Sequence, residues 1–308
     1  MNLKIAAFIG NIDNDGRLFM DKSFQNGVRH ALGMAEAFDA KTEVARRVIF
    51  LADYLKKSGC NSYVLGISGG VDSTTCGMLA QRACTALRSE GYDCRFIAMR
   101  LPYGQQRDER EAQFALTTIQ PDEMRTANIA TATDAIISEQ FGPTPPSGWA
   151  AEIAATIDFV KGNIKARQRM VVQYAIAGES NGLVLGTDHA AEALMGFFTK
   201  FGDGACDVAP LSGLNKRQVR ELARYMGIPE VLVMKVPTAD LEDLDPGKPD
   251  EKAYGVTYDV IDDYLEGMDI PVEYEKLIVA QYLKTQHKRM LPVFPLRHGY
   301  SGVSDHML

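Results

Sequence analysis

The sequence predicts an α/β protein with a parallel, doubly wound sheet of about five strands and helices on both faces. Short runs of almost entirely apolar residues, typical of strands buried on both faces, alternate along the chain with longer segments of helical periodicity. The composition, 46% hydrophobic and 24% charged, is ordinary for a globular protein, and no repeat or low-complexity segment interrupts it. We expect one large domain over residues 42–291, an amino-terminal arm (1–41) of unknown role and a carboxyl-terminal tail (292–308).

The first half of the expected sheet follows an amphipathic helix. Thr42 is a suitable N-cap, and apolar residues three or four positions apart continue this helix to about Lys57. The first strand, Ser62–Ile67, is apolar and rich in β-branched residues, and it leads through a glycine-rich loop into a helix that ends near Arg88. A second apolar strand is expected at Arg95–Met99.

The second half of the sheet has a weaker pattern. A charged helix is expected to start near Asp108, and a third strand is expected at Thr126–Ile129, followed by another helix. The segment Gly142–Gly148 is rich in proline and glycine and can be neither helix nor central strand. A long helix, about Ala150–Ala177, then leads into a fourth buried strand at Gly182–Gly186.

The loop after the first strand, Ser-Gly-Gly-Val-Asp-Ser at residues 68–73, has the composition of a phosphate site. Glycines let the backbone approach a ligand closely, the serines add hydroxyl donors, and the new helix presents its positive end to an anion. Asp72 would repel a bare phosphate, but it can share a divalent cation with one. The loop lacks the lysine of Walker-type loops. A plain glycine-rich turn is the alternative, and it gives no reason for the acid.

A second polar and acidic loop, Thr187–Glu192, follows the fourth strand. Ligands of open α/β sheets bind at the carboxyl ends of the strands, where the strand order reverses. If the first and fourth strands are neighbours at this point, Asp72 and Glu192 converge on one triphosphate and can hold magnesium between them. A solvated loop carboxylate is the alternative for Glu192 taken alone.

Charge and cysteine content exclude several classes of protein. The 33 basic residues against 40 acidic ones give a net charge of −7, which argues against nucleic acid as the principal partner. The five cysteines are odd in number and form no C-x-x-C pair, so we expect free thiols in a reducing cytoplasm and neither disulfides nor zinc. The apolar run at the amino terminus is too short to span a membrane and lacks a cleavage site, so no membrane association is expected.

The glycine-rich loop resembles the PP-loop of the ATP pyrophosphatases, which cleave ATP between the α and β phosphates. Six further segments narrow the family. They are GNIKAR (162–167), GTDHAAE (186–192), GFFTKFGDG (196–204), LNKRQVR (214–220), PTADLED (237–243) and YLKTQHKR (282–289). In this order they make the chain similar to the ammonia-dependent NAD synthetases over about residues 42–291.

The resemblance implies an adenine nucleotide alpha-hydrolase-like fold and a ligase that converts deamido-NAD, ATP and ammonia into NAD, AMP and pyrophosphate. Ammonia does not attack a nicotinate carboxylate, which is a resonance-stabilised anion, so the route passes through an adenylated intermediate with a good leaving group. The resemblance also implies Mg²⁺ and a homodimer with the dinucleotide at the subunit interface. Glutamine-dependent relatives carry a large amidase domain, and the arm before Thr42 is too short to be one; a separate glutaminase partner stays open.

Individual roles follow from the same resemblance. The residues implied in ATP binding are Gly66, Ser68, Gly69, Gly70, Asp72, Ser73, Arg100, Gln106, Thr187, Lys216 and Thr238. Lys216 and Thr238 are also expected to stabilise the transferring phosphorus, and Asp72 and Glu192 to bind Mg²⁺. The residues implied in deamido-NAD binding are Arg167, Lys200, Asp207, His287 and Lys288. Asp207 is in addition a candidate for deprotonating ammonium.

Some of these residues also have simpler explanations. Lys216 at a helix start could be a solvated charge, although a cation against the positive end of a helix is better explained by a nearby anion. His287 and Lys288 lie in a basic run near a helix C-terminus, where pairing with the dipole alone could account for them. His189 is expected to orient its loop and not to bind metal, because no second histidine lies at ligand spacing. The segment Pro237–Glu251 is either a lid that excludes water or an acidic linker.

Two other readings make distinct predictions. A tRNA-modifying enzyme with a PP-loop needs a basic face or catalytic cysteines near the loop, and the charge and the scattered cysteines speak against both. A nucleotide-binding regulatory protein without catalysis would have lost Asp72, Glu192, Lys216 or Thr238, and all four are present.

Overall fold

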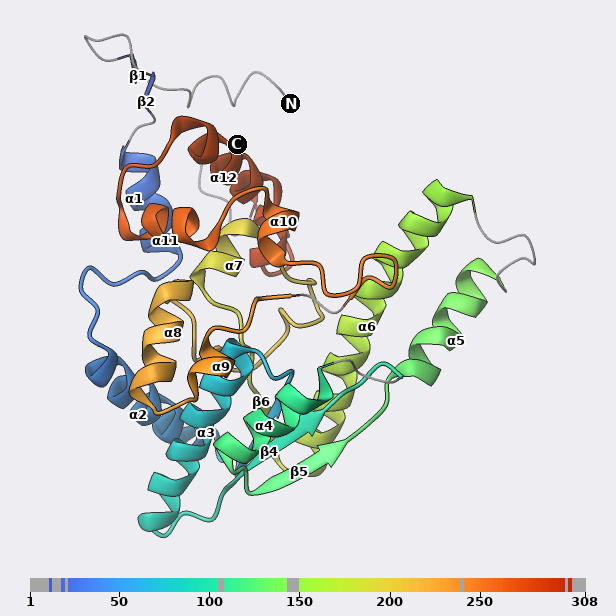
Figure 1. Cartoon of the computed structure of the whole chain (residues 1–308). Coiled ribbons are helices and arrows are strands. Elements are labelled where there is room, and N and C mark those ends of the chain that lie inside the picture. Colours follow the sequence, from blue (N-terminus) through green and yellow to red (C-terminus); the bar gives the residue numbers. More distant parts are fainter. Residues whose placement is uncertain are drawn as a thin grey trace.

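The computed structural model describes residues 11–12, 18–19, 22–104, 108–142, 150–238, 241–296 and 299–300. Its centre is a four-stranded parallel sheet of β3 (Ser62–Gly66), β4 (Arg95–Arg100), β5 (Glu123–Thr126) and β6 (Gly182–Val184), in the order β5-β4-β3-β6 (Figure 1). The strand order reverses between β3 and β6, so the switch point lies where the sequence predicts it. The α/β class is confirmed.

The sheet differs from the prediction in strand number and in one boundary. Among the described residues it has four strands, and a fifth position is marked only by a parallel bridge between Leu185 and Val208. The predicted strand Thr126–Ile129 is wrong by three residues, because β5 is an edge strand that ends at Thr126. Edge strands need no uniformly apolar run. The apolar residue Ile129 is buried instead where the chain enters α5.

Helices cover both faces. The face of α3 (Val71–Ser89) also holds α2 (Ala40–Ser58), α4 (Glu109–Ile119), α8 (Lys216–Tyr225) and α9 (Glu230–Val233). The opposite face is covered by α6 (Ala151–Glu179), along which α5 (Ala130–Phe141) packs; both project from the sheet in Figure 1. The N-cap of α2 is Asp39, whose carboxylate accepts a hydrogen bond from Thr42 N at 2.8 Å, and not Thr42 as predicted.

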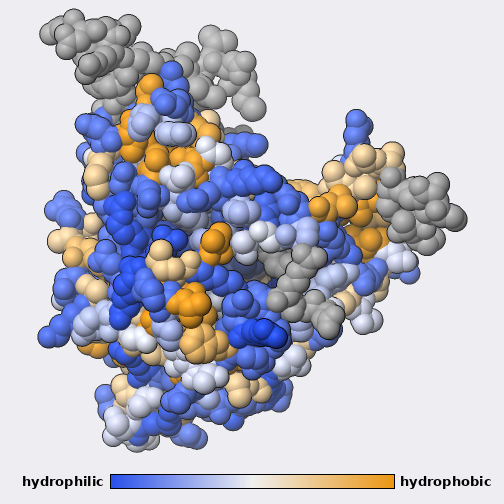
Figure 2. Space-filling model, in the orientation of Figure 1, coloured by the Kyte–Doolittle hydropathy of each residue, from blue (hydrophilic) through white to orange (hydrophobic). Residues whose placement is uncertain are grey.

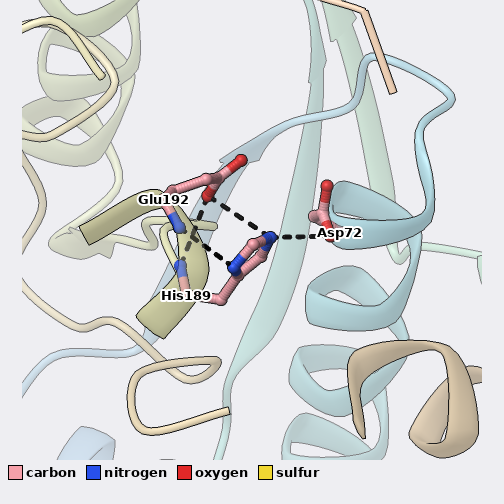
Figure 3. Close-up of side chains that lie close together, drawn as sticks. All are labelled: Asp72, His189 and Glu192. Carbon is pink, nitrogen blue, oxygen red and sulfur yellow. Dashed lines mark hydrogen bonds and ion pairs between the residues drawn. The ribbon is translucent and has the colours of Figure 1, made fainter. Parts of the chain in front are cut away.

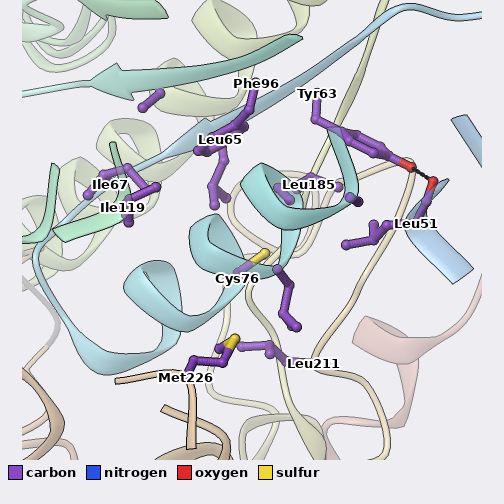
Figure 4. Packing of buried hydrophobic residues seen from close by; sticks show 14 of the residues in the cluster. Leu51, Tyr63, Leu65, Ile67, Cys76, Phe96, Ile119, Leu185, Leu211 and Met226 are labelled. Carbon is purple, nitrogen blue, oxygen red and sulfur yellow. Dashed lines mark hydrogen bonds between the residues drawn. The ribbon is translucent and has the colours of Figure 1, made fainter. Parts of the chain in front are cut away.

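The main core lies between the sheet and α3, and it follows the two-residue period of the strands. Leu65 and Phe96 pack towards α3, whereas Val64 and Ile97 pack towards α6. Apolar side chains on both faces explain why the strand runs are uniformly apolar. Tyr63 lies in the same core, and its hydroxyl donates to the carbonyl of Leu51 on α2 at 2.7 Å (Figure 4).

A second core holds the carboxyl-terminal helices together. It comprises residues from α1 (Lys22–Ala31), α7 (Ala190–Met195), α10 (Asp250–Tyr254), α11 (Tyr258–Glu266) and α12 (Val272–Lys284), which continues into α13 (Gln286–Arg289). Part of the amino-terminal arm is therefore a packed helix, with Val28 buried in this core. Its side chains Gln25 and Arg29 donate to the carbonyls of Tyr264 and Leu265 at the end of α11.

Two short antiparallel pairs complete the described chain. They are β1 (Asn11–Ile12) with β2 (Leu18–Phe19) and β7 (Pro295–Leu296) with β8 (Gly299–Tyr300). None of the helices in the described ranges combines the length and the apolar composition that crossing a bilayer requires.

Candidate active site

A cleft of about 480 Å³ opens where β3, β4 and β6 end. It is lined by many of the predicted residues: Gly66, Ser68, Gly70, Asp72, Ser73, Arg100, Thr187, Glu192, Lys216, Thr238 and Lys288. These residues come from the ends of β3 and β4, from separate loops, and from the first turns of α3, α7, α8 and α13. The cleft therefore lies at the place where α/β sheets bind ligands.

The glycine-rich loop joins β3 to α3 and packs tightly against α4. Gly69 has a φ of +82°, and a Cβ atom there would lie 2.6 Å from the backbone nitrogen of Ala112, so only glycine fits. Gly70 is the N-cap of α3 and makes no side-chain capping bond. The positive end of α3 therefore faces the cleft without a competing side-chain acceptor from its own cap.

Two serine hydroxyls brace the loop from inside. The Oγ atoms of Ser68 and Ser73 are 3.1 Å apart, and Ser73 Oγ also accepts from Ser68 N at 3.3 Å. Ser68 Oγ in turn accepts from Gly70 N at 3.3 Å. These hydroxyls hold the loop in one conformation and can be redirected to a phosphate oxygen, because a hydroxyl both donates and accepts.

Asp72 and Lys216, which both line the cleft, form an ion pair. Lys216 Nζ lies 2.8 Å and 2.7 Å from the two carboxylate oxygens of Asp72. The Lys216 side chain is fully buried, with its ammonium 5.0 Å from the centre of the Tyr258 ring. Burial alone would raise the pKa of Asp72, but the charge of Lys216 and its hydrogen bonds to the carboxylate outweigh that effect and leave the pKa below its ordinary value. Lys216 is thus no solvated surface lysine; it faces an anion.

His189 lies between the two predicted metal ligands (Figure 3). Its Nε2 is 3.6 Å from Asp72 Oδ1 and 3.7 Å from Glu192 Oε2. His189 is also the N-cap of α7: its Nδ1 accepts from Glu192 N, and Glu192 accepts from His189 N. Burial, together with the charge of Lys216, lowers the pKa of His189 to about 3, so the ring is neutral at pH 7. With Nδ1 accepting from Glu192 N, the proton is assigned to Nε2, and the ring fixes the start of α7.

The carboxylates of Asp72 and Glu192 fit a divalent cation. One ligand atom from each of Asp72, His189 and Glu192 lies within 4.8 Å of the others. Burial, and then the charge of Asp72, raises the pKa of Glu192 well above its ordinary value. Two acids that face each other in a buried cleft repel, and a hard cation between their oxygens relieves that repulsion.

Arg100 ties the glycine-rich loop to α4. It lies at the end of β4, donates to the carbonyl of Ile67, and forms an ion pair of 2.7 Å with Glu109. Arg100 therefore lines the cleft with its guanidinium already engaged by protein groups. Gln106, predicted in the same loop, lies outside the described residues.

The structure gathers four of the residues predicted to bind deamido-NAD around the loop at 196–201. Arg167 donates to the carbonyl of Lys200 at 3.3 Å, and Lys200 Nζ donates to the carbonyl of His287 at 2.5 Å. Lys288 Nζ donates to two carbonyls of the loop, those of Gly196 and Phe198. Of these four residues, only Lys288 lines the cleft itself. The other three are not part of the lining.

Asp207 stands apart from this group. Its Oδ2 accepts from the backbone nitrogen of Val184 at 2.7 Å, and its Oδ1 lies 3.4 Å from the hydroxyl of Tyr174. Asp207 is not part of the cleft lining. Its carboxylate satisfies a backbone donor of β6, which is a structural task.

The segment that contains Thr238 forms one wall of the cleft. Thr238 pairs with Pro249 through an isolated bridge, and Leu241 lines the cleft beside it. This wall is bound to α6: Asp158 accepts from two backbone nitrogens of residues 243 and 244, and Lys165 forms an ion pair of 2.5 Å with Asp243. Such docking favours a lid over a free linker. Residues 239–240 lie outside the described part.

The sequence analysis does not identify several polar residues of the cleft, among them Gln173, Lys235 and Asp108. Gln173 on α6 accepts from Gly66 N at 2.7 Å and fixes the end of β3. Lys235 pairs with Asp108 at 3.0 Å across the cleft wall. A polar side chain on the sheet-facing side of α6 is a signal for Gln173, and Lys235 lies two residues before the segment PTADLED. For Asp108, the sequence indicates only the start of a helix.

Comparison with known proteins agrees with this geometry. The NAD synthase family model matches residues 43–292. The chain belongs to this family. It is 56% identical over 270 residues to an NH3-dependent NAD+ synthetase from Burkholderia lata, a match that covers 88% of this chain and 94% of the relative.

Solved structures show the same fold. The crystal structure of an NAD+ synthetase from Burkholderia pseudomallei is 50% identical and superposes with a TM-score of 0.75, covering 88% of this chain and 98% of the other. An NMN synthetase from Francisella tularensis is 33% identical, with a TM-score of 0.72 and coverage of 84% and 99%. Members of this fold thus include proteins named for a dinucleotide product and one named for a mononucleotide product.

Proposed function

We propose that this member of the NAD synthase family is a ligase that amidates deamido-NAD with ammonia at the expense of ATP, giving NAD, AMP and pyrophosphate. One observation carries the proposal: a buried Lys216–Asp72 pair faces Glu192 across a cleft at the switch point of the sheet. This arrangement belongs to a chain 56% identical to an NH3-dependent NAD+ synthetase.

The reaction divides into two displacements. A carboxylate oxygen of the nicotinate attacks the α-phosphorus of ATP, an O–P bond forms, and pyrophosphate leaves. The nitrogen of ammonia then attacks the acyl carbon of the mixed anhydride, a C–N bond forms, AMP leaves with the electron pair, and one proton of the ammonium goes to solvent or a base. Both displacements place negative charge on phosphate oxygens, so the cleft must supply donors and cations to them.

The chain offers such donors at two levels of the cleft. The glycine-rich loop and the start of α3 line the cleft with the hydroxyls of Ser68 and Ser73, and they would face the phosphates. We infer that Lys216 and Thr238, which both line the cleft, contact the oxygens of the transferring phosphorus. Lys216 then moves part of its interaction from Asp72 to the phosphates.

Asp72 and Glu192 would hold Mg²⁺, since their oxygens converge and His189 fixes both loops. When bound, the ion neutralises phosphate charge and orients the pyrophosphate as a leaving group. Because Asp72 belongs to the phosphate loop itself, an ion held by the two carboxylates would already lie next to the phosphates.

The wall that contains Thr238 would keep water away from the mixed anhydride. Lys165 and Asp158 bind this wall to α6, and Leu241 presents an apolar side chain to the cleft. Water at high concentration would otherwise compete with ammonia for the acyl carbon. The binding of this wall to α6 supports an active site that closes.

Product analysis with paired acceptors tests the proposal. Purified protein is given ATP, Mg²⁺ and either deamido-NAD or nicotinate mononucleotide, each with ammonium or with glutamine. We expect NAD and an equal amount of AMP from deamido-NAD with ammonium, and none from glutamine alone. Faster turnover of the mononucleotide would assign the chain to the reaction for which the Francisella relative is named. If neither NAD nor the amide of the mononucleotide is formed, the proposal is refuted.

We also propose a homodimer. Helices α5 and α6 expose large apolar side chains, and Figure 2 shows apolar surface where these helices project. The exposed side chains are Ile136, Ile153, Phe159 and Val171. Phe159 is 63% exposed and also lines the cleft, so a partner seated on this surface would cover the cleft mouth. Light scattering should give twice the mass of 33.9 kDa, and a monomeric mass at assay concentration would contradict this.

The five cysteines are free, which supports the cytoplasm as the compartment in which the protein acts.

A further inference from the structure

We propose that α11 positions Lys216 for the reaction and that Asp262 is the positioning residue, an inference that rests on the proposed function. Asp262 is fully buried and lies under the first turn of α8, where Lys216 is the first helical residue. It does not line the cleft. Its effect on chemistry would therefore pass through Lys216.

The first turn of α8 has three backbone donors that no helical carbonyl can satisfy. One of them, Gln218 N, donates to the side chain of its N-cap, Asn215, at 2.8 Å. The other two donate to Asp262: Lys216 N to Oδ1 at 3.0 Å and Arg217 N to Oδ2 at 2.7 Å. One carboxylate from another helix thus completes the cap.

This arrangement also offsets the unfavourable position of the Lys216 cation at the start of a helix. A cation at the first position of a helix opposes the positive end of the dipole. The Asp262 side chain lies against the same two backbone nitrogens, and its two acceptor oxygens supply the partial negative charge that the helix start prefers. Lys216 can then extend its ammonium away from α8 towards Asp72.

The same face of α11 supports the other end of the lysine. Tyr258 lies four residues before Asp262, so both side chains point from one side of the helix. The ring of Tyr258 lies 5.0 Å from Lys216 Nζ, while Asp262 holds Lys216 N. Helix α11 thus fixes the lysine at its backbone and at its ammonium.

Peripheral pairs keep the two helices in register but do not touch Lys216. Arg217 forms ion pairs with Asp263 at 2.9 Å and with Glu266 at 2.8 Å, and Asn215 donates to Glu266 at 2.7 Å. In the described part of the chain, the side chain of Asp263 is paired with Arg217, and it is partly exposed. It offers a matched control on the same helix.

The experiment compares Asp262→Asn with Asp263→Asn in the full-length enzyme. Wild-type NAD formation from deamido-NAD, ATP, Mg²⁺ and ammonium is measured first, so that a failure of the proposed function is recognised before the variants are read. We expect Asp262→Asn to lower kcat by about 10- to 100-fold, as small misplacements of a reacting group do. The KM for deamido-NAD should stay within about twofold, and Asp263→Asn should stay near wild type.

A second readout does not depend on activity. Amide hydrogen exchange at residues 216 and 217 should be slow in the wild type and should quicken in Asp262→Asn, while Asp263→Asn leaves it slow. The proposal is overturned if a folded Asp262→Asn keeps kcat within about twofold, if Asp263→Asn lowers kcat equally, or if these amides exchange freely in the wild type. If Asp262→Asn does not fold, Asp262→Ser, which keeps one acceptor, is judged by the same criteria.

Discussion

Lys216 Nζ lies 2.8 Å and 2.7 Å from the two carboxylate oxygens of Asp72, although 144 residues separate them in the chain. The pair joins the phosphate loop to the start of α8 through a fully buried ammonium. Each partner has a separate expected task, Asp72 towards the metal and Lys216 towards the phosphates. The pairing keeps both charges neutralised until a substrate supplies new partners for them.

Replacing Lys216 should therefore affect stability as well as activity. Lys216→Met leaves the Asp72 carboxylate in a buried site without its cation, and we expect a loss of about 3–5 kcal/mol in the free energy of unfolding. NAD formation should fall by at least about 100-fold. The matched control is Lys56→Met, which removes a surface pair with Glu90 at 3.5 Å and should cost less than about 1 kcal/mol. Denaturant titration and initial rates check both; equal stability of the two variants would contradict the buried pair.

Removing Glu192, the second of the two proposed metal ligands, should change the magnesium concentration that the enzyme requires. Glu192→Gln keeps the shape of the side chain and removes one of the two facing charges. Activity should fall, and the Mg²⁺ concentration for half-maximal rate should rise about tenfold or more. Without Mg²⁺ at pH 7, the variant should be at least as stable as the wild type, because the repulsion from Asp72 is gone. An unchanged Mg²⁺ titration would remove Glu192 from the metal site.

Asp262 predicts a pH dependence of stability. Burial raises its pKa to about 7 from 3.8, and the hydrogen bonds from Arg217 N and Lys216 N together with the Arg217 charge offset only part of that, while Glu266 opposes them. The folded state therefore holds this proton more tightly than the unfolded state. The resulting stabilisation is complete below pH 3.8 and is lost as the pH rises to about 7.

The difference in unfolding free energy between wild type and Asp262→Asn measures this effect. Between pH 4 and pH 8, the free energy of unfolding of the wild type should fall relative to that of Asp262→Asn by up to about 4 kcal/mol. Urea titrations at both pH values check the sign. A difference that is constant with pH would show that Asp262 titrates normally.

Weakening the contact between the cleft wall and α6 should cause ATP to be consumed without formation of NAD. Asp158→Asn removes the charge that accepts from the two backbone nitrogens of residues 243 and 244. Water should then reach the mixed anhydride, and the ratio of AMP to NAD should rise above one. Glu152→Gln, an exposed position in the first turn of the same helix, is the control and should keep the ratio at one. If the ratio of AMP to NAD stays at one in Asp158→Asn, this contact does not control the closure of the cleft.

Asp207 should prove structural. Asp207→Asn weakens the bond to Val184 N and should lower stability by about 1 kcal/mol. We expect kcat to stay within about threefold of wild type, because the carboxylate is not part of the cleft lining. A large loss of kcat at unchanged stability, measured by initial rates and thermal melts, would restore the role that the resemblance implies.

Much of the site could be predicted because its chemistry is local. A phosphate loop is made of consecutive residues, so the segment Ser68–Ser73 predicts both the turn and the binding of a phosphate. The meeting of Asp72 with Glu192 followed from one topological rule, the reversal of strand order between β3 and β6. Uniformly apolar strand runs gave the correct fold class, since both sheet faces are covered.

The remaining features depend on contacts that the sequence does not encode locally. The strand β5 was misplaced because an edge strand lacks an apolar run, and Asp39 was overlooked because the cap lies before the first periodic residue. Neither the Asp262 contact with α8 nor the use of Asp207 by β6 leaves a pattern. Both join residues brought together only by the tertiary fold.

The docking of α1 on the end of α11 has a consequence for biosynthesis. Gln25 bonds to a carbonyl 239 residues further along the chain, and Arg29 to one 236 residues further along. Loops of this length close slowly. On the ribosome, the phosphate loop and the first strands can pair early, but the lysine at 216 obtains its support only after α11 has been made. A nascent chain would therefore form its nucleotide site in an immature state and become catalytically competent only near the end of translation.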